Sequence, residues 1–440
     1  MTDQTWAAPV AAGPLDAVVS IPGSKSETSR ALALALLADA PTVIRGALNS
    51  RDSQLMVDAL RQFGAQVSWE GDTCTVTPPA QLIAPTDTVQ CGLAGTVMRF
   101  MAPVATLVSG DVRFDGDPAA RKRPMAGLLD ALSSLGAQIT YEGQAGFLPF
   151  VVHGQGGLEG GRVEIDSSES SQFLSALILV APRCERGLEI HSVGSLPSIP
   201  HVRMTWDAVQ SRGVACRVAE MTVMKGAEEP CAWVIEPGPI TGETVTIDPD
   251  LTNAGPFLAA PLLAGGQVRM TNWPSHTSQP GDHWRGLLTA MGGRVNCDDE
   301  GGIISQYMGP ISPVSLHMYA LGELVPTVAA LAAFAVSPST LSGIAHLRGH
   351  ETDRLAALED SLTRIGVGAK VTRGALTVSP APAHGAQLDS FGDHRMAMFG
   401  AIVGLVTPGV TVVGMDAVDK TFPTFPTLWE QMVATGNSRL

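Results

Sequence analysis

One phrase recurs six times along the 440-residue chain, and it limits the possible folds more than any other feature. In VDALRQFGAQVSW and LDALSSLGAQITY, the end of an amphipathic helix is followed by a glycine and then by an alternating strand. Solenoid repeats are shorter, at about 20 to 50 residues. The pattern therefore predicts six small folded units, three in each of two domains. The glycines lie 70 to 79 residues apart, at Gly64, Gly136, Gly213, Gly292, Gly366 and Gly436.

Each copy of the phrase has a local physical cause. The apolar i, i+3, i+4 spacing indicates a helix face, and a glycine can adopt the left-handed conformation that ends a helix. In AQVSWEGDTCTVTPP a second strand follows a glycine-bearing turn, which is typical of a hairpin. Each unit thus combines a helix and a hairpin with a preceding strand and helix, and the fold class is α/β. The segment EPGPITGE, residues 236–243, indicates a domain boundary near residue 240.

The composition limits the possible partners. Hydrophobic residues make up 45% of the chain and charged residues 16%, which suits a folded protein with large apolar interiors. A net charge of -14 and an aromatic content of 5% argue against nucleic-acid binding, which needs a basic field and stacking side chains. The longest apolar stretch, residues 319–336, contains Glu323 and Pro326, so we expect a buried helix there and no membrane span.

The cysteines and the N-terminus indicate a compartment. No CxxC pair and no Cys/His cluster at zinc spacing is present, so we expect buried thiols in a reducing environment. The N-terminal MTDQTWAAPV lacks the basic and apolar regions of a secretory signal. We therefore expect a cytoplasmic protein. The six cysteines are Cys74, Cys91, Cys184, Cys216, Cys231 and Cys297.

Cations and hydroxyls are concentrated in PGSKSETSR, residues 22–30, directly before the helix-prone run ALALALLADA. Backbone N–H groups and the dipole at a helix start attract an anion, and Lys25 and Arg30 would strengthen this attraction. An ordinary helix start capped by serines would carry the same hydroxyls. This stretch by itself leaves both interpretations open.

Two further stretches of the first half combine small residues with cations. In CGLAGTVMRF, residues 91–100, small residues leave room for a ligand near Arg99. In DPAARKRPMAGLLDAL, residues 117–132, Arg123 is the last of three cations before a helix start, which again favours an anion. A solvated basic loop is the structural alternative.

Hydroxyls precede two more expected helices. The segment IDSSESSQFLSALILVAP, residues 165–182, opens an apolar helix with serines and Gln172. This pattern caps a helix and can equally hold a phosphate. The segment SIPHVRMT, residues 198–205, adds Ser198 and His201 at another strand-to-helix transition.

The second half also places charged side chains at helix starts, in GHETDRLAAL, FGDHRMAMFG and VDKTFPTFP. Glu323 precedes a very apolar helix, where a carboxylate is either a simple N-terminal charge or a general base. Fixed positive charge beside His346, His350 and His394 disfavours a cation, so we expect no metal. The charged and histidine residues of the three motifs are His350, Glu351, Asp353, Arg354, Asp393, His394, Arg395, Asp419 and Lys420, and Arg348 directly precedes the first motif.

Taken together, the motifs resemble those of the 5-enolpyruvylshikimate-3-phosphate synthase family, in the same order. The resemblance covers nearly the whole chain, and CGLAGT and LRGHETDRLAAL are most similar to the actinobacterial branch. The motifs that carry it are PGSKSETSRALALALLA, LAGTVMRF, RKRPMAGLLDAL, SSQFLSAL, GHETDRL, DHRMAM and DKTFP.

The resemblance implies a two-domain inverse α/β barrel of six βαβαββ units, three per domain. Residues 22–243 would form an N-terminal domain that mainly binds shikimate 3-phosphate. Residues 1–21 and 244–440 would form a discontinuous C-terminal domain that contributes to the phosphoenolpyruvate site and to catalysis. The crossings between the domains would lie near residues 22 and 243.

The implied reaction transfers the enolpyruvyl group of phosphoenolpyruvate to the 5-hydroxyl of shikimate 3-phosphate. Phosphate would leave through a noncovalent tetrahedral intermediate, without a cofactor. Apart from the resemblance, we expect a monomer that binds neither nucleic acid nor a membrane. The two substrates carry about five to six negative charges. The motifs contain eight cations to match them: Lys25, Arg30, Arg99, Arg123, Arg348, Arg354, Arg395 and Lys420.

The resemblance also implies roles residue by residue. Shikimate 3-phosphate would contact Lys25, Ser26, Arg30, Ser170, Ser171, Gln172, Ser198, Glu323 and His350. Phosphoenolpyruvate would contact Lys25, Gly95, Arg123, Gln172, Arg354, Arg395 and Lys420. Glu323 would take the 5-hydroxyl proton, and Glu351 and Lys25 would move protons at the enolpyruvyl methylene. The implied catalytic residues are Lys25, Glu323, Glu351 and His394.

The chain departs from better-known members of the family at four positions. Leu93 stands where they carry Asn, His201 where they carry Tyr, His350 where they carry Lys, and Glu323 where they carry Asp. Leu93 is the one replacement whose side chain cannot hydrogen-bond. The family's glycine is kept at Gly95, which predicts sensitivity to glyphosate, an inhibitor that occupies the phosphoenolpyruvate site in this family.

Two alternative functions are open at this point. The related transferase that acts on UDP-N-acetylglucosamine shares the fold, but Pro118 stands where its loop cysteine would fall. A catalytically silent binding scaffold could have the same repeats. Retention of the expected reactive side chains argues against loss of function; they are Lys25, Glu323, Glu351, Arg354 and Lys420.

Overall fold

The computed structural model describes residues 5–224 and 227–437, and the chain divides into two compact units. Gly23–Ile247 forms the N-terminal unit, and Met1–Pro22 with Asp248–Leu440 forms the C-terminal unit. The second crossing lies after Ile247, four residues beyond the expected one, because β14 (Thr244–Thr246) pairs in parallel with β3 (Thr42–Arg45). Residues 1–4 and 438–440 of the expected C-terminal domain lie outside the described residues.

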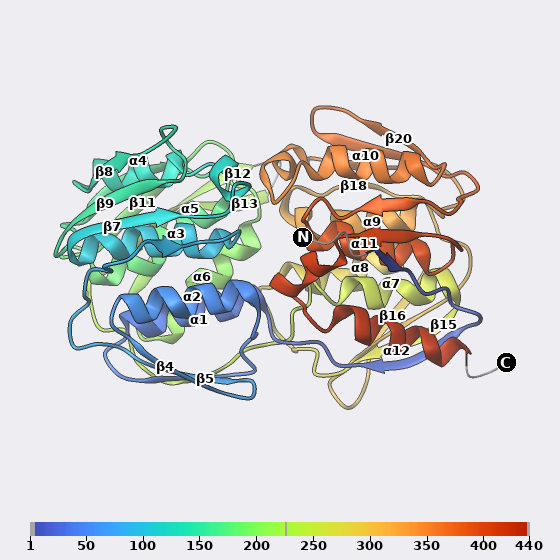
Figure 1. Ribbon diagram of the computed structural model, residues 1–440, viewed down its shortest axis with the longest axis horizontal. Coiled ribbons are helices and arrows are strands. Elements are labelled where there is room, and N and C mark those ends of the chain that lie inside the picture. Colours follow the sequence, from blue (N-terminus) through green and yellow to red (C-terminus); the bar gives the residue numbers. More distant parts are fainter. Residues whose placement is uncertain (1–4, 225–226, 438–440) are drawn as a thin grey trace. The chain divides into compact units, whose positions relative to one another are not determined.

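The described part of the N-terminal unit contains three four-stranded sheets of one topology (Figure 1). In each sheet a parallel pair of strands is followed by an antiparallel hairpin. In sheet order, the strands are β14, β3, β5 (Thr73–Thr77) and β4 (Gln66–Glu70); β6 (Val89–Gln90), β7 (Ser109–Asp115), β9 (Phe150–Gln155) and β8 (Gln138–Tyr141); and β10 (Gly161–Asp166), β11 (Leu188–Val193), β13 (Ala227–Ile235) and β12 (Cys216–Met224).

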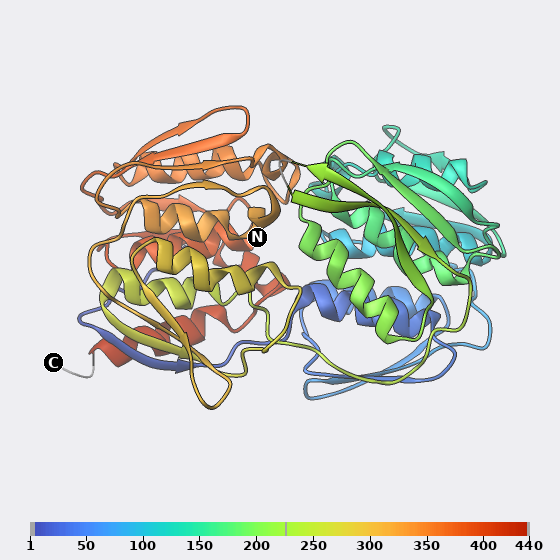
Figure 2. The ribbon, with the colours of Figure 1, turned by 180° about the vertical axis from the view of Figure 1, so that it is seen from behind.

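Two kinds of helix alternate along this unit. The helices α1 (Lys25–Leu37), α3 (Gly95–Val104) and α5 (Ser171–Val180) are buried on nearly all sides and contact one another. A helix that is apolar all round belongs in a core. The sheets lie outside these helices, as Figures 1 and 2 show, which is the inverse arrangement of an ordinary α/β barrel. The more exposed helices are α2 (Arg51–Gln62), α4 (Ala126–Ser134) and α6 (Ile199–Ser211).

The C-terminal unit repeats this plan. Its buried helices are α7 (Gly255–Ala264), α9 (Val325–Ala332) and α11 (His394–Gly404), and the others are α8 (Trp284–Ala290), α10 (Arg354–Arg364) and α12 (Phe425–Asn437). In sheet order, its strands are β2 (Leu15–Val19), β15 (Gly266–Met270), β17 (Ile303–Gln306) and β16 (Arg294–Cys297); β18 (Ser315–His317), β19 (Ser339–Ser342), β21 (Ala375–Ser379) and β20 (Gly368–Val371); and β22 (Gln387–Asp389), β23 (Thr411–Val413) and β1 (Thr5–Ala7).

Five of the six repeated glycines end a helix as predicted. Their φ angles lie between 79° and 100°, a left-handed conformation that favours glycine, and each is followed by a strand; they are Gly64, Gly136, Gly213, Gly292 and Gly366. The prediction is wrong for Gly436, which lies inside α12. The sixth sheet instead obtains its third strand from the other end of the chain, because β1 pairs antiparallel with β23.

The fold tests two expectations, a buried helix within residues 319–336 and buried cysteine thiols. The apolar stretch at residues 319–336 contains the buried helix α9, preceded by a 3-10 turn at Tyr319–Leu324. In the described part of the chain, no helix has both the length and the apolarity needed to cross a membrane. The expectation of buried thiols holds for Cys74, Cys91 and Cys184 but is wrong for Cys297, which lies exposed on β16.

Candidate active site

The three buried helices of the N-terminal unit begin close together. The Thr96 hydroxyl on α3 donates to Oγ of Ser29 on α1 over 3.2 Å. A Cβ atom at Gly95 would lie 3.1 Å from Oε1 of Gln172, in the first turn of α5. Free N–H groups and aligned peptide dipoles at helix starts favour an anion. The sequence motifs at residues 22–30, 91–100 and 165–182 therefore meet at one place.

Lys25, the first residue of α1, has a carboxylate partner that the sequence analysis missed. Its Nζ lies 3.5 Å from Oδ2 of Asp52, whose side chain is 4% exposed. Asp52 lies in the first turn of α2, after the capping residue Ser50. An acidic residue at a helix start was a visible signal, but nothing local to residues 51–53 indicates that Lys25 lies opposite.

Arg30 lies in the second turn of α1 and is almost fully buried. Its Nε donates to the Thr205 hydroxyl over 2.7 Å, and its Nη groups donate to the carbonyls of Ser26 and His201 over 2.8 and 2.9 Å. Burial lowers the pKa of Arg30 to about 10. Arg30 thus ties α1 to the first turn of α6, beside Ser198.

Ser198 precedes α6 with a φ angle of 55°, a left-handed conformation that is uncommon outside glycine. Backbone strain of this kind is concentrated at functional sites. Ser170 caps α5, its hydroxyl accepting from the backbone N–H of Gln172 over 3.3 Å, and Ser171 is buried next to it. The predicted hydroxyls therefore all lie in or next to helix starts.

Gly95, Arg99, Arg123 and Gln172 form one cluster. A Cβ atom at Gly95 would lie 2.9 and 3.0 Å from the two Nη atoms of Arg123, so the backbone of α3 runs directly against this guanidinium. Arg123 donates from Nη1 to the backbone carbonyl of Leu93 over 3.0 Å. This contact uses the backbone of residue 93, so it does not need a side chain that can hydrogen-bond. Arg121, in contrast, pairs with Asp115.

In the C-terminal unit, Arg354 is the centre of a second cluster. Its side chain has no exposed surface, and all five of its N–H groups are used. Nε donates to Asp393 over 2.7 Å, and Nη2 donates to Glu351 over 2.8 Å and to Asp393 over 3.3 Å. Nη1 donates to Glu323 over 2.9 Å and to Nδ1 of His350 over 3.0 Å.

The carboxylate of Glu323 bridges two arginines. Its Oε2 also accepts from Nε of Arg395 over 2.5 Å. Burial acts to raise the pKa of Glu323, but the charges of Arg395 and Arg354 outweigh it and hold the pKa well below its usual range. Glu323 is therefore ionised at neutral pH, as the surrounding cations predict.

His350 differs in charge from the lysine found in better-known members of the family. Burial and the adjacent Arg354 lower the pKa of His350 to about 3, so the ring is neutral at physiological pH. Because an arginine only donates, Nδ1 is the acceptor and the ring proton lies on Nε2. His350 can donate one hydrogen bond to a ligand, but it does not supply the positive charge of a lysine.

The remaining predicted residues differ in whether they belong to the Arg354 cluster. Lys420 Nζ lies 3.6 Å from Oε1 of Glu351, which joins it to the cluster. His394 is buried at the start of α11, with Nδ1 3.6 Å from Oδ1 of Asp393. Arg348 instead pairs with Asp353 on the surface, so it does not belong to the cluster.

The charge of this cluster differs from the excess of cations expected from the motifs. Three cations, Arg354, Arg395 and Lys420, lie within ion-pair distance of three carboxylates. The carboxylates are Glu323, Glu351 and Asp393. The cluster is therefore close to neutral. Matching the eight cations of the motifs to the substrate charges overestimated the positive charge of this cluster.

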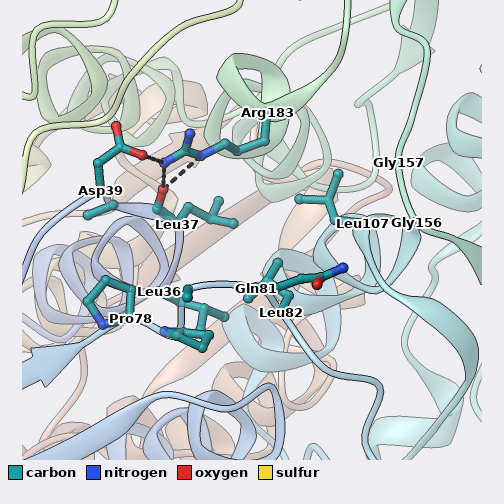
Figure 3. A pocket seen from close by; sticks show the side chains of 13 residues that line it. Leu36, Leu37, Asp39, Pro78, Gln81, Leu82, Leu107, Gly156, Gly157 and Arg183 are labelled. Carbon is teal, nitrogen blue, oxygen red and sulfur yellow. Dashed lines mark hydrogen bonds and ion pairs between the residues drawn. The ribbon is translucent and has the colours of Figure 1, made fainter.

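A separate cavity of about 550 Å³ lies at the opposite end of α1 from Lys25 (Figure 3). Leu36 and Leu37 line it, and Arg183 beside it donates to the carbonyl of Leu37 and pairs with Asp39 over 2.6 Å. None of the predicted substrate-binding residues lines this cavity.

Comparison with known proteins decides the family. The family model described as EPSP synthase (3-phosphoshikimate 1-carboxyvinyltransferase) matches residues 10–429. The chain belongs to the EPSP synthase family. It is 46% identical over 447 residues to a 3-phosphoshikimate 1-carboxyvinyltransferase of Kocuria rhizophila, with 98% of this chain and 97% of that protein covered. The predicted resemblance to this family is confirmed.

Solved structures confirm the fold. An EPSP synthase from Acinetobacter baumannii superposes with a TM-score of 0.78 at 21% identity, with 98% of each chain covered. The enolpyruvyl transferase NikO from Streptomyces tendae gives a TM-score of 0.71 at 18% identity, with 96% of each chain covered. The chain therefore has the enolpyruvyl transferase fold. The family match and the 46% identical relative show that its activity is that of the EPSP synthase transferases. The family assignment decides against the UDP-N-acetylglucosamine alternative and the silent scaffold.

Proposed function

We propose that the helix starts of the N-terminal unit and the Arg354 cluster of the C-terminal unit bind the substrates of this transferase. Shikimate 3-phosphate binds at the starts of α1, α5 and α6, where helix dipoles, hydroxyls and cations meet. The protein groups that hold it in the N-terminal unit are Lys25, Ser26, Arg30, Ser170, Ser171, Gln172 and Ser198. Glu323 and the neutral His350 of the C-terminal unit add hydrogen bonds.

For phosphoenolpyruvate we propose the side chains that the family resemblance implies, several of which are arginines. Arg123 beside Gly95, together with Lys25 and Gln172, binds one part of it, and Arg354, Arg395 and Lys420 bind the other. A guanidinium presents a fork of donors that suits planar carboxylate and phosphate groups.

The reaction needs two proton movements. The 5-hydroxyl oxygen attacks C2 of phosphoenolpyruvate as Glu323 takes the hydroxyl proton, and Glu351 and Lys25 move the proton that the methylene carbon gains. The resulting noncovalent tetrahedral adduct loses phosphate, and the methyl group returns a proton to restore the double bond. His394, buried against Asp393, supports the second step. No metal or organic cofactor takes part.

The location and assembly of the enzyme are part of the same proposal. Free cysteines suit a reducing compartment, and we place the protein in the cytoplasm. A single chain supplies all the substrate-binding groups, so we propose that the enzyme works as a monomer.

The observation that carries this proposal is the contact of the Gly95 backbone with both the Arg123 guanidinium and the Gln172 amide. The kinetics of paired variants test the proposed substrate sites. Arg395→Gln should raise the KM for phosphoenolpyruvate about tenfold or more and change the KM for shikimate 3-phosphate by less than about threefold. Arg364→Gln, at an exposed ion pair with Asp360, is the matched control and should change neither. A rise confined to shikimate 3-phosphate would contradict the assignment.

A further inference from the structure

Glu323 lies between the two arginines to which we assign phosphoenolpyruvate. One oxygen, Oε2, accepts from Arg354 over 2.9 Å and from Arg395 over 2.5 Å. A carboxylate oxygen held by two guanidinium groups is the arrangement expected for a bound substrate carboxylate. The protein thus carries an internal carboxylate at the position that a substrate carboxylate would need.

Arg354 has no spare donor for a ligand. Its five N–H groups are divided among Asp393, Glu351, Glu323 and His350. A substrate oxygen can therefore bond to Arg354 only by replacing one of these groups. Arg395 differs, because the structure shows no partner for its terminal Nη groups among the described residues.

Of the three carboxylates on Arg354, Glu323 is the one suited to leave. Its side chain is 21% exposed, against 11% for Glu351 and 0% for Asp393. Asp393 is also held by the cap of α11, where it accepts from the backbone N–H of Arg395. Glu323 lies in a short 3-10 turn that is interrupted by non-helical angles at Leu321, so a small change of this turn can move it.

Resting on the substrate assignment above, we propose that Glu323 determines the affinity for phosphoenolpyruvate, because the substrate carboxylate must displace it from Arg354 and Arg395. The exchange replaces one carboxylate by another, so both arginines stay neutralised. The released Glu323 loses the contacts that keep its pKa low. It therefore becomes a stronger base for the 5-hydroxyl proton once phosphoenolpyruvate is bound.

Two substitutions separate displacement from a simple change of charge. Glu323→Asp keeps the charge but shortens the side chain by one methylene, which weakens its bridge between the arginines. Glu323→Gln keeps the length but removes the charge. Glu300→Gln is the matched control, because Glu300 is an exposed carboxylate of the same unit, paired with Arg269.

Calorimetry with glyphosate as a nonreacting probe of the phosphoenolpyruvate site gives the readout. Each protein is first saturated with shikimate 3-phosphate, whose own Kd is measured separately. We expect the Kd of glyphosate to fall about tenfold or more in Glu323→Gln, to fall by a smaller factor in Glu323→Asp, and to stay unchanged in Glu300→Gln. A damaged fold would not bind the probe more tightly.

The other outcomes overturn the inference in distinguishable ways. An unchanged or higher Kd in both Glu323 variants rules out displacement while leaving the substrate assignment intact. A lower Kd in Glu323→Gln with a wild-type Kd in Glu323→Asp shows an effect of charge alone and also rules out displacement. If the wild-type protein binds neither shikimate 3-phosphate nor glyphosate, the proposed substrate sites themselves are wrong.

Discussion

Arg99 donates from Nη1 to Oε1 of Gln172 over 2.8 Å, and this contact sets the orientation of the Gln172 amide. Arg99 is 2% exposed, and its guanidinium lies over the ring of Phe173, with 5.2 Å between the central carbon and the ring centroid. Because an arginine only donates, Oε1 is the acceptor, and the amide NH2 is left to donate to an anionic ligand.

Arg99→Met should therefore impair binding without direct contact between Arg99 and substrate. Met fills a similar volume but cannot hold the Gln172 oxygen, so the amide loses its fixed orientation. We expect the KM for phosphoenolpyruvate to rise about tenfold. Steady-state kinetics measures this, and Arg99→Lys, which keeps a charged donor, should recover part of the loss. Wild-type KM values for both substrates in Arg99→Met would show that the contact does not position Gln172.

Gly95→Ala should weaken phosphoenolpyruvate and glyphosate together. The new Cβ would lie within 3.1 Å of Arg123 and Gln172, whose flexible ends can shift, so the fold is preserved while the binding groups are displaced. We expect the KM for phosphoenolpyruvate and the inhibition constant of glyphosate each to rise about tenfold or more, with an unchanged melting temperature. The wild-type enzyme should be inhibited by glyphosate, and full turnover at millimolar inhibitor would contradict this.

Two aspartates at helix starts offer a matched test of the buried cluster. Asp393 caps α11 and also holds Arg354, whereas Asp353 caps α10 and pairs with the half-exposed Arg348. Asn preserves a cap at either position. Asp393→Asn should lower the free energy of unfolding by about 3 to 5 kcal/mol, as expected when a buried ion pair is broken.

Asp353→Asn should lower it by less than about 1 kcal/mol, since only an exposed pair is lost. Urea unfolding of both variants measures the difference. Equal losses would show that the Asp393 carboxylate acts only as a helix cap.

The neutral state of His350 has a consequence for acid stability. Its pKa is about 3 in the folded protein and about 6.5 in an unfolded chain. Between these values the unfolded chain binds a proton that the folded protein does not, so stability is lost as the pH falls below about 6.5. The contribution of one such group has a slope of up to about 1.4 kcal/mol per pH unit.

His350→Gln removes this proton uptake. Its stability should therefore fall less steeply than that of the wild type between pH 6.5 and pH 4.5, as measured by urea midpoints. Glu323, whose pKa is also lowered, contributes an acid loss in the same direction to both proteins. Parallel curves for the two proteins would mean that His350 is not neutral in the folded state.

Local signals in the sequence predicted much of the fold. Five repeated glycines end helices because their conformation depends on neighbouring residues. Gly436 does not, because the strand that completes its sheet is β1, more than 400 residues away in the chain. Pairing between distant strands leaves no mark in the residues near Gly436.

The candidate site likewise combines positions that the local sequence predicts with contacts that it does not predict. Motifs at helix starts identified Lys25, Gly95, Gln172 and Arg354, whose positions follow from local structure. Their partners could not be read locally, because Asp52 meets Lys25, and other carboxylates meet Arg354, only through tertiary packing. Counting cations therefore overstated the positive charge of the C-terminal cluster.

We propose that this chain uses Lys25 and its neighbours to join phosphoenolpyruvate to shikimate 3-phosphate. Phosphate release from the purified protein, measured with both substrates, with each substrate separately and in the presence of a metal chelator, tests it most directly. We predict release that requires both substrates, is unaffected by the chelator and falls at least about a hundredfold in Lys25→Met. Release that needs only phosphoenolpyruvate, or that is unchanged in Lys25→Met, would contradict the account.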